Sequence, residues 1–423
     1  IRRLGGWQHN AARVLPEKQR IDDRVAELFV PVILIISLLT FFIWVFFGGI
    51  DVVSHGLFAA LSVLVVACPC VVGLATPVAL AAGLNKAARN HILIRDTSAL
   101  EQMRNVDVVV FDKTGTLTEG HPTVIGWLWA QGQEEHYKDV LLAAESTSDH
   151  PLAEAIVTAL EGEEQVIPAH LDGFENITGK GVRVAYQGAE YWVGSHKLLK
   201  DYQANLSDIL ADMLTQYESD GNSIVYFGRE NDLLAVIAIK DQLRVTSMEA
   251  IRELRIQDIE ICMLTGDGER TASSVAGSLG IMRFVADAMP DDKEDFIHKL
   301  QLQGKTVAMV GDGVNDAQAL SCADVSIAMG KGTDTLMDTA MITLRTSDLL
   351  LLPKVFRLSR QTVSLMYRNL FWAFIYNTVG IFVAAGVLYP VYDILLSPAL
   401  AGAAMALSCV SVALSSLRLS SRF

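Results

Sequence analysis

The chain has 423 residues, 51% of them hydrophobic, and a formal net charge of −14 at pH 7. It is too long for one ordinary domain, and its acidic balance argues against nucleic-acid binding, which relies on an excess of Lys and Arg. The five cysteines are an odd number without the spacing of a disulfide framework, which is typical of a reducing compartment. We therefore expect several domains and no nucleic-acid partner.

The first 20 residues are mixed and polar, and they lack the charged-then-apolar pattern of a signal peptide. They also show no pattern typical of a folded unit. We interpret residues 1–20 as a linker that follows a region outside this chain.

Four long apolar stretches flank a soluble middle part. A membrane-spanning helix needs about 20 apolar residues, and each stretch reaches that length. We predict four membrane-spanning helices in two pairs, within residues 21–84 and 351–423. The stretches are Ala26–Phe47, Gly56–Leu84, Asn369–Tyr392 and Ile394–Leu417.

Lys and Arg are distributed unevenly around these stretches. They flank both pairs on the side of the soluble part, as at Arg24, Lys86 and Arg418, whereas the short connections within each pair have none. Cytoplasmic loops carry an excess of Lys and Arg. We therefore predict a multi-pass integral membrane protein whose soluble part is cytoplasmic.

The second apolar stretch contains Cys68-Pro69-Cys70 and, further on, Pro77. On a regular helix, residues two positions apart point about 200° away from each other, so two such thiols cannot face one ion. Proline removes a backbone donor and clashes with the preceding turn. We therefore expect a helix that is unwound at Pro69, so that both thiols converge, and bent at Pro77.

Three apolar, β-branched segments of the soluble part each end in Asp or Thr followed by Gly. They begin the sequences VVVFDKTGT at residue 108, ICMLTGDG at residue 261 and VAMVGDGVND at residue 307. Such runs are typical of buried parallel strands, and ligands of open α/β sheets bind at the carboxyl ends of these strands. The pattern predicts one site at that edge of the sheet.

The residue types at these strand ends suit phosphoryl transfer. Asp112 is a candidate carboxylate nucleophile, and Lys113 and Lys293 could neutralise charge on the transferring oxygens. Mg²⁺ prefers oxygen ligands, for which Asp112, the carbonyl of Thr114 and Asp312 are the natural set. The other members of the predicted catalytic set are Thr116, Thr265, Gly266, Asp267, Asn315 and Asp316, of which Asp316 is also a predicted magnesium ligand.

The motifs DKTGT, TGD and GDGVND, with the Lys of MPDDK, resemble those of the phosphorylation domain of P-type ATPases, which has a haloacid-dehalogenase-like fold. The resemblance implies a Rossmannoid α/β domain in two parts, residues 85–120 and 238–350. It also implies that Asp112 receives the γ-phosphate of ATP, with ATP and Mg²⁺ as cofactors.

Residues 121–237 interrupt this α/β pattern. Within them, AESTSDHPL, which ends at residue 152, and ITGKGV, which begins at residue 177, resemble parts of the nucleotide-binding domain of the heavy-metal branch of the family. The resemblance implies an inserted α+β domain. Its implied contacts to adenine and phosphates are Glu145, His150, Gly179 and Gly181. Ser195 stands where the family often has Asn.

Cys-Pro-Cys resembles the signature of heavy-metal-transporting P-type ATPases, and IYNTVG and MALSC resemble the Tyr-Asn and Met-x-x-Ser-Ser signatures of their Cu(I) subgroup. The resemblance implies Cu(I), or the equally soft Ag(I), as the transported ion, in line with the preference of sulfur ligands for soft ions. The implied ligands of the ion are Cys68, Cys70, Tyr376, Asn377, Met405 and Cys409. The chain departs from the subgroup at Cys409, where Ser is usual, and at Phe382, where Pro is usual.

The chain contains no Thr-Gly-Glu loop, which in this family belongs to the actuator domain, and no Cys-x-x-Cys module. We therefore expect the C-terminal portion of a pump, lacking the actuator domain and the N-terminal metal-binding modules, which accepts phosphate at Asp112 but dephosphorylates poorly alone. The resemblance implies ATP, membrane lipid, a metal ion delivered by a soluble copper chaperone and the missing N-terminal region as partners, in a bacterial plasma membrane. Two alternatives stay open: a Zn²⁺/Cd²⁺ pump, and a truncated metal-binding membrane protein that does not pump.

Overall fold

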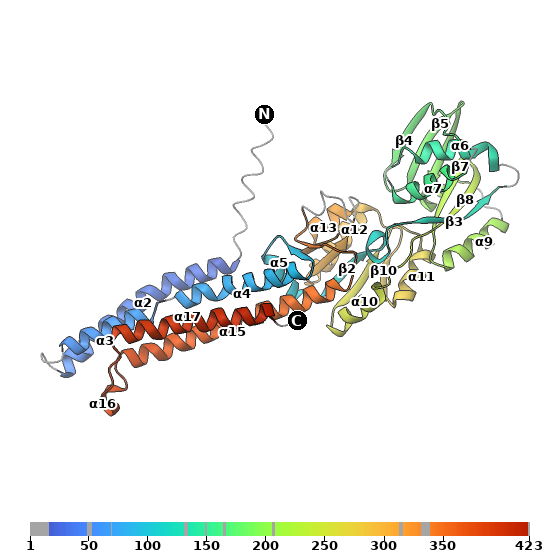
Figure 1. Ribbon diagram of the computed structural model, residues 1–423. Helices are drawn as coiled ribbons and strands as arrows, with labels where there is room; N and C mark the ends of the chain where they lie inside the picture. Colours follow the sequence, from blue (N-terminus) through green and yellow to red (C-terminus); the bar gives the residue numbers. More distant parts are fainter. Residues whose placement is uncertain are drawn as a thin grey trace, which may run out of the picture. The chain divides into compact units, whose positions relative to one another are not determined.

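The computed structural model describes residues 17–48, 53–68, 70–130, 134–148, 150–163, 166–204, 208–312, 316–330 and 339–421 (Figure 1). The chain falls into two compact units. The first comprises Ile1–Asn90 and Arg357–Phe423, and its described regular elements are all helices, whereas the second, His91–Phe356, holds both β-sheets.

The first unit is built from long apolar helices. Three described segments are long and apolar enough to cross a membrane, namely Phe29–Phe47, Val53–Arg89 and Pro398–Leu419. Large apolar side chains are exposed along the first of them, and Phe46 is 84% exposed. An apolar surface of this extent is typical of contact with lipid. The helices are α2 (Glu17–Gly48), α3 (Val53–Val66), α4 (Cys70–Arg89), α15 (Leu351–Ala384), α16 (Tyr389–Tyr392) and α17 (Pro398–Ser421).

The predicted span Asn369–Tyr392 differs from the structure. α15 ends at Ala384, and α16 begins only at Tyr389. The helical part of the stretch also includes the buried amides of Asn369 and Asn377, which make it less apolar than the other spans. The part of the chain that is described therefore contains three candidate spans, where the sequence predicts four.

The helix is broken beside Pro69, as the sequence predicts. α3 ends at Val66 and α4 begins at Cys70, with Ala67 in a turn between them. Pro69 itself lies outside the described residues. α4 continues as one helix through Pro77, so the second proline does not end it.

The larger sheet of the second unit has seven strands in the order β1-β13-β12-β11-β2-β9-β10. Every neighbouring pair is parallel except β1 with β13. β2, β11 and β12 are buried along their whole length, which explains their continuous apolar sequences. The strands are β1 (Ile92–Ile94), β2 (Val108–Asp112), β9 (Glu260–Leu264), β10 (Arg283–Val285), β11 (Val307–Gly311), β12 (Val325–Met329) and β13 (Ile342–Leu344). The helices between them are α5 (Ser98–Gln102), α10 (Ser247–Ile256), α11 (Glu269–Leu279), α12 (Pro290–Leu302) and α13 (Ala317–Cys322).

The smaller sheet is antiparallel, with the order β3-β8-β7-β6-β5-β4, and in the sequence it is inserted between β2 and β9. A core that includes Leu141, Ile156 and Phe227 packs helices α6 and α7 on this sheet. The strands are β3 (Thr123–Trp129), β4 (Gly173–Ile177), β5 (Gly181–Tyr186), β6 (Ala189–Gly194), β7 (Ser223–Arg229) and β8 (Asp232–Lys240). The helices are α6 (Glu134–Glu145), α7 (Pro151–Glu161), α8 (His196–Asp201) and α9 (Asp208–Ser219). The predicted α/β domain with an α+β insert is therefore present.

Candidate active site

Three strand ends meet at one edge of the larger sheet. β2 lies between β11 and β9, and all three strands are parallel, so their carboxyl ends point the same way. This order places Asp112 at the end of β2, Thr265 after β9 and Asp312 after β11. The three sequence motifs thus share one edge of the sheet.

Lys293 connects two acidic residues at this edge. Its Nζ donates to Oδ1 of Asp112 at 2.6 Å and to Oδ1 of Asp316 at 2.7 Å. Lys293 comes from α12, and Asp316 directly precedes α13. Burial lowers the pKa of Lys293, but the two carboxylates outweigh this effect and raise it above its ordinary value, so the ammonium group is charged. The neighbouring Asn315 lies outside the described residues.

Asp112, Asp312 and Asp316 bring carboxylate oxygens to within 4.8 Å of one another. Burial, followed by the charge of Asp112, raises the pKa of Asp312 to about 7. The same two causes raise the pKa of Asp316 to about 7, against the opposing effect of Lys293. Buried carboxylates held this close together disfavour their own charge, and a hard cation such as Mg²⁺, which prefers oxygen ligands, fits between them.

The loop after β2, residues 113–117, holds the remaining predicted residues of the first motif. Thr114 has an extended backbone, with φ −73° and ψ 130°. Thr116 is fully buried, and within the described ranges its Oγ1 has no hydrogen-bond partner. A buried hydroxyl without a partner costs about 1–3 kcal/mol, so this atom fits a polar ligand at the site.

Gly115 is required by the close approach of this loop to β11. Its φ is +69°, and a Cβ at this position would lie 1.4 Å from Oδ2 of Asp312. No larger residue could take its place without moving the carboxylate.

Two residues that the sequence reasoning missed hold the loop. Arg244 donates to the backbone oxygens of Gly115 and Thr116, the latter at 2.9 Å. Asp241 accepts hydrogen bonds from the hydroxyl of Thr118 and, at 3.1 Å, from the backbone N–H of Gly120. Both residues follow the end of β8, so the same pattern of a buried strand followed by charged residues could have revealed them.

Lys113 lies at the junction of the two sheets. Its Nζ forms an ion pair with Asp267 and donates to Oγ of Ser223 at 3.1 Å. The hydroxyl of Thr265 donates to Asp267 at 3.1 Å, and Gly266 lies between them in the turn after β9. Burial raises the pKa of Asp267, but Lys113 outweighs burial and holds it below its ordinary value. Ser223, the first residue of β7, is a further contact that the sequence reasoning missed.

Glu145 and His150 flank the loop between α6 and α7. Glu145 is the last residue of α6, and burial raises its pKa to about 7. His150 is the N-cap of α7, where its Nδ1 accepts from the backbone N–H of Leu152 at 3.2 Å. Because Nδ1 accepts, Nε2 carries the proton of the neutral ring and can donate to a ligand.

Gly179 and Gly181 lie at the turn between β4 and β5, on a different segment from Glu145 and His150. A Cβ on Gly179 would lie 2.6 Å from Met289, and one on Gly181 would lie 2.1 Å from the carbonyl oxygen of Val193. The backbone contact therefore requires Gly181 even without a ligand, whereas Gly179 is favoured by its positive φ of +69°. Ser195, after β6, has a buried Oγ without a hydrogen-bond partner among the residues that the structure describes.

Cys68 and Cys70 are joined by a disulfide, with their Cα atoms 5.4 Å apart. This corrects the expectation of two converging free thiols, and it differs from the reducing compartment that the cysteine count suggests. The physical reason is the break between α3 and α4, which allows the two sulfurs to meet at a Cα separation typical of disulfides. Only the reduced pair could bind a metal ion, because the thiolate is the ligand.

Met405 and Cys409 lie near the start of α4. They are four residues apart on α17, so they share one face of that helix. Both pack against a cluster that contains Val71 and Val72, which directly follow Cys70. The structure thus brings the sulfur-containing side chains of α17 close to the first turn of α4.

Tyr376 and Asn377 point in different directions from α15. Tyr376 is 46% exposed, and its ring stacks on that of Trp372 with centroids 5.7 Å apart. Asn377 is buried, and its Nδ2 has no hydrogen-bond partner within the described part of the chain. Of this predicted pair, Asn377 is the residue that points into the helical unit.

Residues 106–324 match the family of haloacid dehalogenase-like hydrolases. A copper-exporting P-type ATPase of Legionella pneumophila subsp. pneumophila is 43% identical over 401 residues, which cover 95% of this chain and 54% of that protein. A silver exporting P-type ATPase of Salmonella typhimurium is 44% identical over 406 residues, which cover 95% of this chain and 49% of that protein. The chain spans about half the length of these curated relatives.

The chain is also similar to solved structures of heavy-metal ATPases. A zinc-transporting PIB-type ATPase in the E2.Pi state is similar over 94% of this chain and 63% of its own, with a TM-score of 0.67 and 32% identity. The catalytic domain of the CPx-ATPase CopB-B is similar over 64% of this chain and 97% of its own, with a TM-score of 0.54 and 28% identity.

Proposed function

Because the chain belongs to the heavy-metal P-type ATPases, and its residues 106–324 to the haloacid dehalogenase-like hydrolases, we propose that it is part of a pump that uses ATP to export Cu(I) or Ag(I) across a membrane. The pump works through an aspartyl phosphate at Asp112. The observation that carries this proposal is Lys293 bonded to both Asp112 and Asp316, beside Asp312, at the edge of the larger sheet.

Asp112 is the nucleophile. One of its carboxylate oxygens forms a bond to the γ-phosphorus of ATP while the bond from that phosphorus to the bridging oxygen breaks, and ADP leaves with the electron pair. Lys293 holds Oδ1 of Asp112, so we expect Oδ2 to attack. The charge of Lys293 also offsets that of the incoming phosphate. Mg²⁺ held by Asp112, the carbonyl of Thr114, Asp312 and Asp316 would supply further positive charge to the transferring oxygens.

The inserted domain binds the nucleotide. Glu145, whose pKa is raised to about 7 by burial, can donate or accept at the adenine edge, and Nε2 of His150 can donate. Lys113 lies between this domain and Asp112, since it contacts Ser223 on β7 and Asp267 after β9. An incoming triphosphate would compete with Asp267 for this lysine.

The helical unit forms the path of the ion. We assign α15 as the fourth membrane-spanning helix, and the two membrane parts lie within residues 21–84 and 351–423. A soluble copper chaperone would deliver the ion to the helical unit.

The remaining parts of the chain lie in the cytoplasm of a bacterium. The phosphorylation domain comprises residues 85–120 and 238–350, and the nucleotide-binding domain comprises residues 121–237.

Soft sulfur ligands support Cu(I) or Ag(I) as the ion. Met405 and Cys409 pack against the apolar cluster that contains Val71 and Val72, the two residues after Cys70, and thiolate and thioether select soft monovalent ions. The relatives described above are named as copper-exporting and silver exporting. A Zn²⁺ pump is the second candidate, because the zinc-transporting structure is similar over 94% of this chain.

Phosphorylation from radiolabelled ATP tests the proposal. With Cu(I) and a reductant present, the full chain is expected to acquire an acid-stable, hydroxylamine-sensitive label. Asp112→Asn should abolish the label because it removes the attacking oxygen. Asp107→Asn is the matched control: Asp107 precedes β2, and its carboxylate accepts from the backbone N–H of Thr306.

Each outcome has a definite meaning. A label that survives in Asp112→Asn contradicts the assignment of the nucleophile. Stronger stimulation of labelling by Zn²⁺ than by Cu(I) favours the zinc pump and contradicts the choice of ion.

A further inference from the structure

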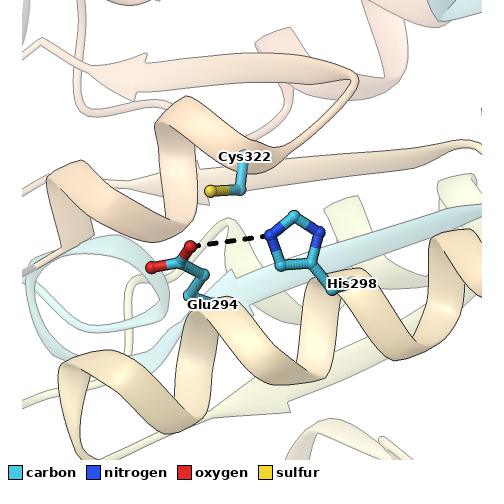
Figure 2. Close-up of side chains that lie close together, drawn as sticks. All are labelled: Glu294, His298 and Cys322. Carbon is cyan, nitrogen blue, oxygen red and sulfur yellow. Dashed lines mark ion pairs between the residues drawn. The ribbon is translucent and has the colours of Figure 1, made fainter.

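Three side chains with metal-binding atoms converge between α12 and α13, and the proposed phosphoryl transfer uses none of them. Glu294 and His298 are four residues apart on α12, so they share one face of this helix, and Cys322 is the last residue of α13. Figure 2 shows the three side chains directed toward one another. Their ligand atoms, one from each residue, lie within 4.8 Å of one another.

Gln301 determines which nitrogen of the neutral His298 ring carries the proton. Nε2 of Gln301 donates to the backbone carbonyl of Cys322 at 2.8 Å, so its Oε1 is left to accept. This Oε1 lies 3.1 Å from Nδ1 of His298, which must therefore carry a proton. In the neutral ring the lone pair is then on Nε2, which lies 3.5 Å from Oε1 of Glu294. In this tautomer Nε2 and the carboxylate oxygen each offer a lone pair that a single cation can bind.

We propose that Glu294, His298 and Cys322 bind one Zn²⁺ ion, with water as the fourth ligand. Sulfur, imidazole nitrogen and carboxylate oxygen together are the donors that suit Zn²⁺. Bonds of about 2.0–2.3 Å in a tetrahedral site place the donor atoms roughly 3.3–3.7 Å apart. Small side-chain rotations would bring the three donor atoms, which lie within 4.8 Å of one another, to these distances. The thiol of Cys322 releases its proton to solvent when the ion binds.

The surroundings of the three residues support a site of this kind. A ligating histidine usually donates its other ring N–H to a fixed acceptor, which is the role of Gln301 here. The site lies about 120° around α12 from Lys293, because residues on a helix advance by about 100° each. Lys293 lies on α12, and Asp316 directly precedes α13. Nζ of Lys293 donates to Oδ1 of Asp316 at 2.7 Å. Bound Zn²⁺ would thus fix the spacing of the two helices that hold this contact.

Titration with Co²⁺, a spectroscopic substitute for Zn²⁺, tests the site in the full chain. Cys68→Ser and Cys70→Ser are included throughout, so that the membrane thiols do not contribute. We expect one equivalent of Co²⁺ to bind with a thiolate-to-cobalt charge-transfer band that Zn²⁺ displaces. Cys322→Ser should remove the band, and Glu294→Gln and His298→Gln should each weaken Co²⁺ binding by about tenfold or more. His170→Gln is the matched control, which should leave the band unchanged.

Alkylation gives a second measurement that does not depend on the folding of a variant. In the unsubstituted chain, Zn²⁺ is expected to slow the reaction of Cys322 with iodoacetamide by about tenfold, because the free thiolate is the nucleophile. Mg²⁺ should have no such effect, and mass spectrometry of the peptide reads the rate. Equal rates with and without Zn²⁺, or a cobalt band that survives Cys322→Ser, would overturn the site and leave only an ion pair between His298 and Glu294.

Discussion

Glu145 is buried at the end of α6, and burial raises its pKa from 4.5 to about 7. An unfolded chain keeps the lower value. Between these two values the folded protein binds more protons than the unfolded chain does, so the contribution of Glu145 to the free energy of unfolding falls as the pH rises from 4.5 to 7. A nucleotide that contacts Glu145 would therefore meet a carboxyl that is partly protonated near neutral pH.

Glu145→Gln should remove this loss of stability. At pH 8 we expect the variant to be more stable than the wild type by about 3 kcal/mol, and at pH 5 by about 1 kcal/mol or less, since one pKa unit corresponds to about 1.4 kcal/mol. Urea unfolding of the His91–Phe356 unit at both pH values measures the difference. Glu154→Gln, an exposed carboxyl on α7, is the control and should show no such change. A variant no more stable than the wild type at pH 8 would contradict the burial of a costly charge.

Among the elements, the loop of residues 113–117 shows how the sheet and the chemistry depend on each other. Gly115 and Gly188 both have positive φ, +69° and +75°. A Cβ on Gly115 would collide with Asp312, whereas one on Gly188 would have nothing within 4 Å. Alanine substitutions at these two glycines therefore distinguish the effect of backbone strain from the effect of a collision with the carboxylate.

Gly115→Ala should abolish phosphorylation from ATP. Its Cβ would take the place of Oδ2 of Asp312, which must move away from Asp112. Gly188→Ala should cost only the strain of positive φ, about 1–2 kcal/mol, and should keep the full label. The amount of label per folded protein, with folding measured by circular dichroism, compares the two variants. A normal level of label in Gly115→Ala would show that phosphorylation does not require the close approach of this loop to Asp312.

Much of the site could be predicted from the sequence because its motifs follow buried strands. Such strands have recognisable apolar runs, and their carboxyl ends necessarily share an edge when the strands are parallel neighbours. Arg244 and Asp241 also follow a buried strand, β8, but their role could not be predicted from the sequence, because they act through contacts with residues far along the chain. Arg244 reaches the carbonyl of Thr116 across 128 positions of sequence, and only the folded insert brings these positions together.

The helices show a second limit. The long apolar stretch Asn369–Tyr392, which has no charged residue, predicts a span over its full length, yet α15 ends at Ala384. The absence of charge does not determine where a helix ends, and Gly386, at φ +91°, lies in the turn that follows. The broken helix beside Pro69 could be predicted because the effect of a proline is local.

The whole molecule combines a helical unit with sulfur-containing side chains and a second unit, His91–Phe356, with the carboxylate cluster. The sequence predicted the family correctly and the fold in part, with four spans where the described residues contain three candidates, because the motifs of each part are local in the chain. It did not predict the bond between Cys68 and Cys70, which depends on how the broken helix brings the two sulfurs together. In our proposal, binding of the ion to the reduced pair of cysteines promotes phosphoryl transfer to Asp112.

The most direct test is to locate the phosphate and to ask whether the ion controls it. Borohydride converts an aspartyl phosphate to homoserine, so mass spectrometry of the peptide that contains DKTGT identifies the phosphorylated residue. With ATP, Mg²⁺, Cu(I) and a reductant, we expect homoserine at position 112, and we expect it to be lost when Cys68→Ser and Cys70→Ser are introduced. Homoserine at another aspartate, or an equal yield at position 112 without the ion and in the cysteine variants, would contradict the account.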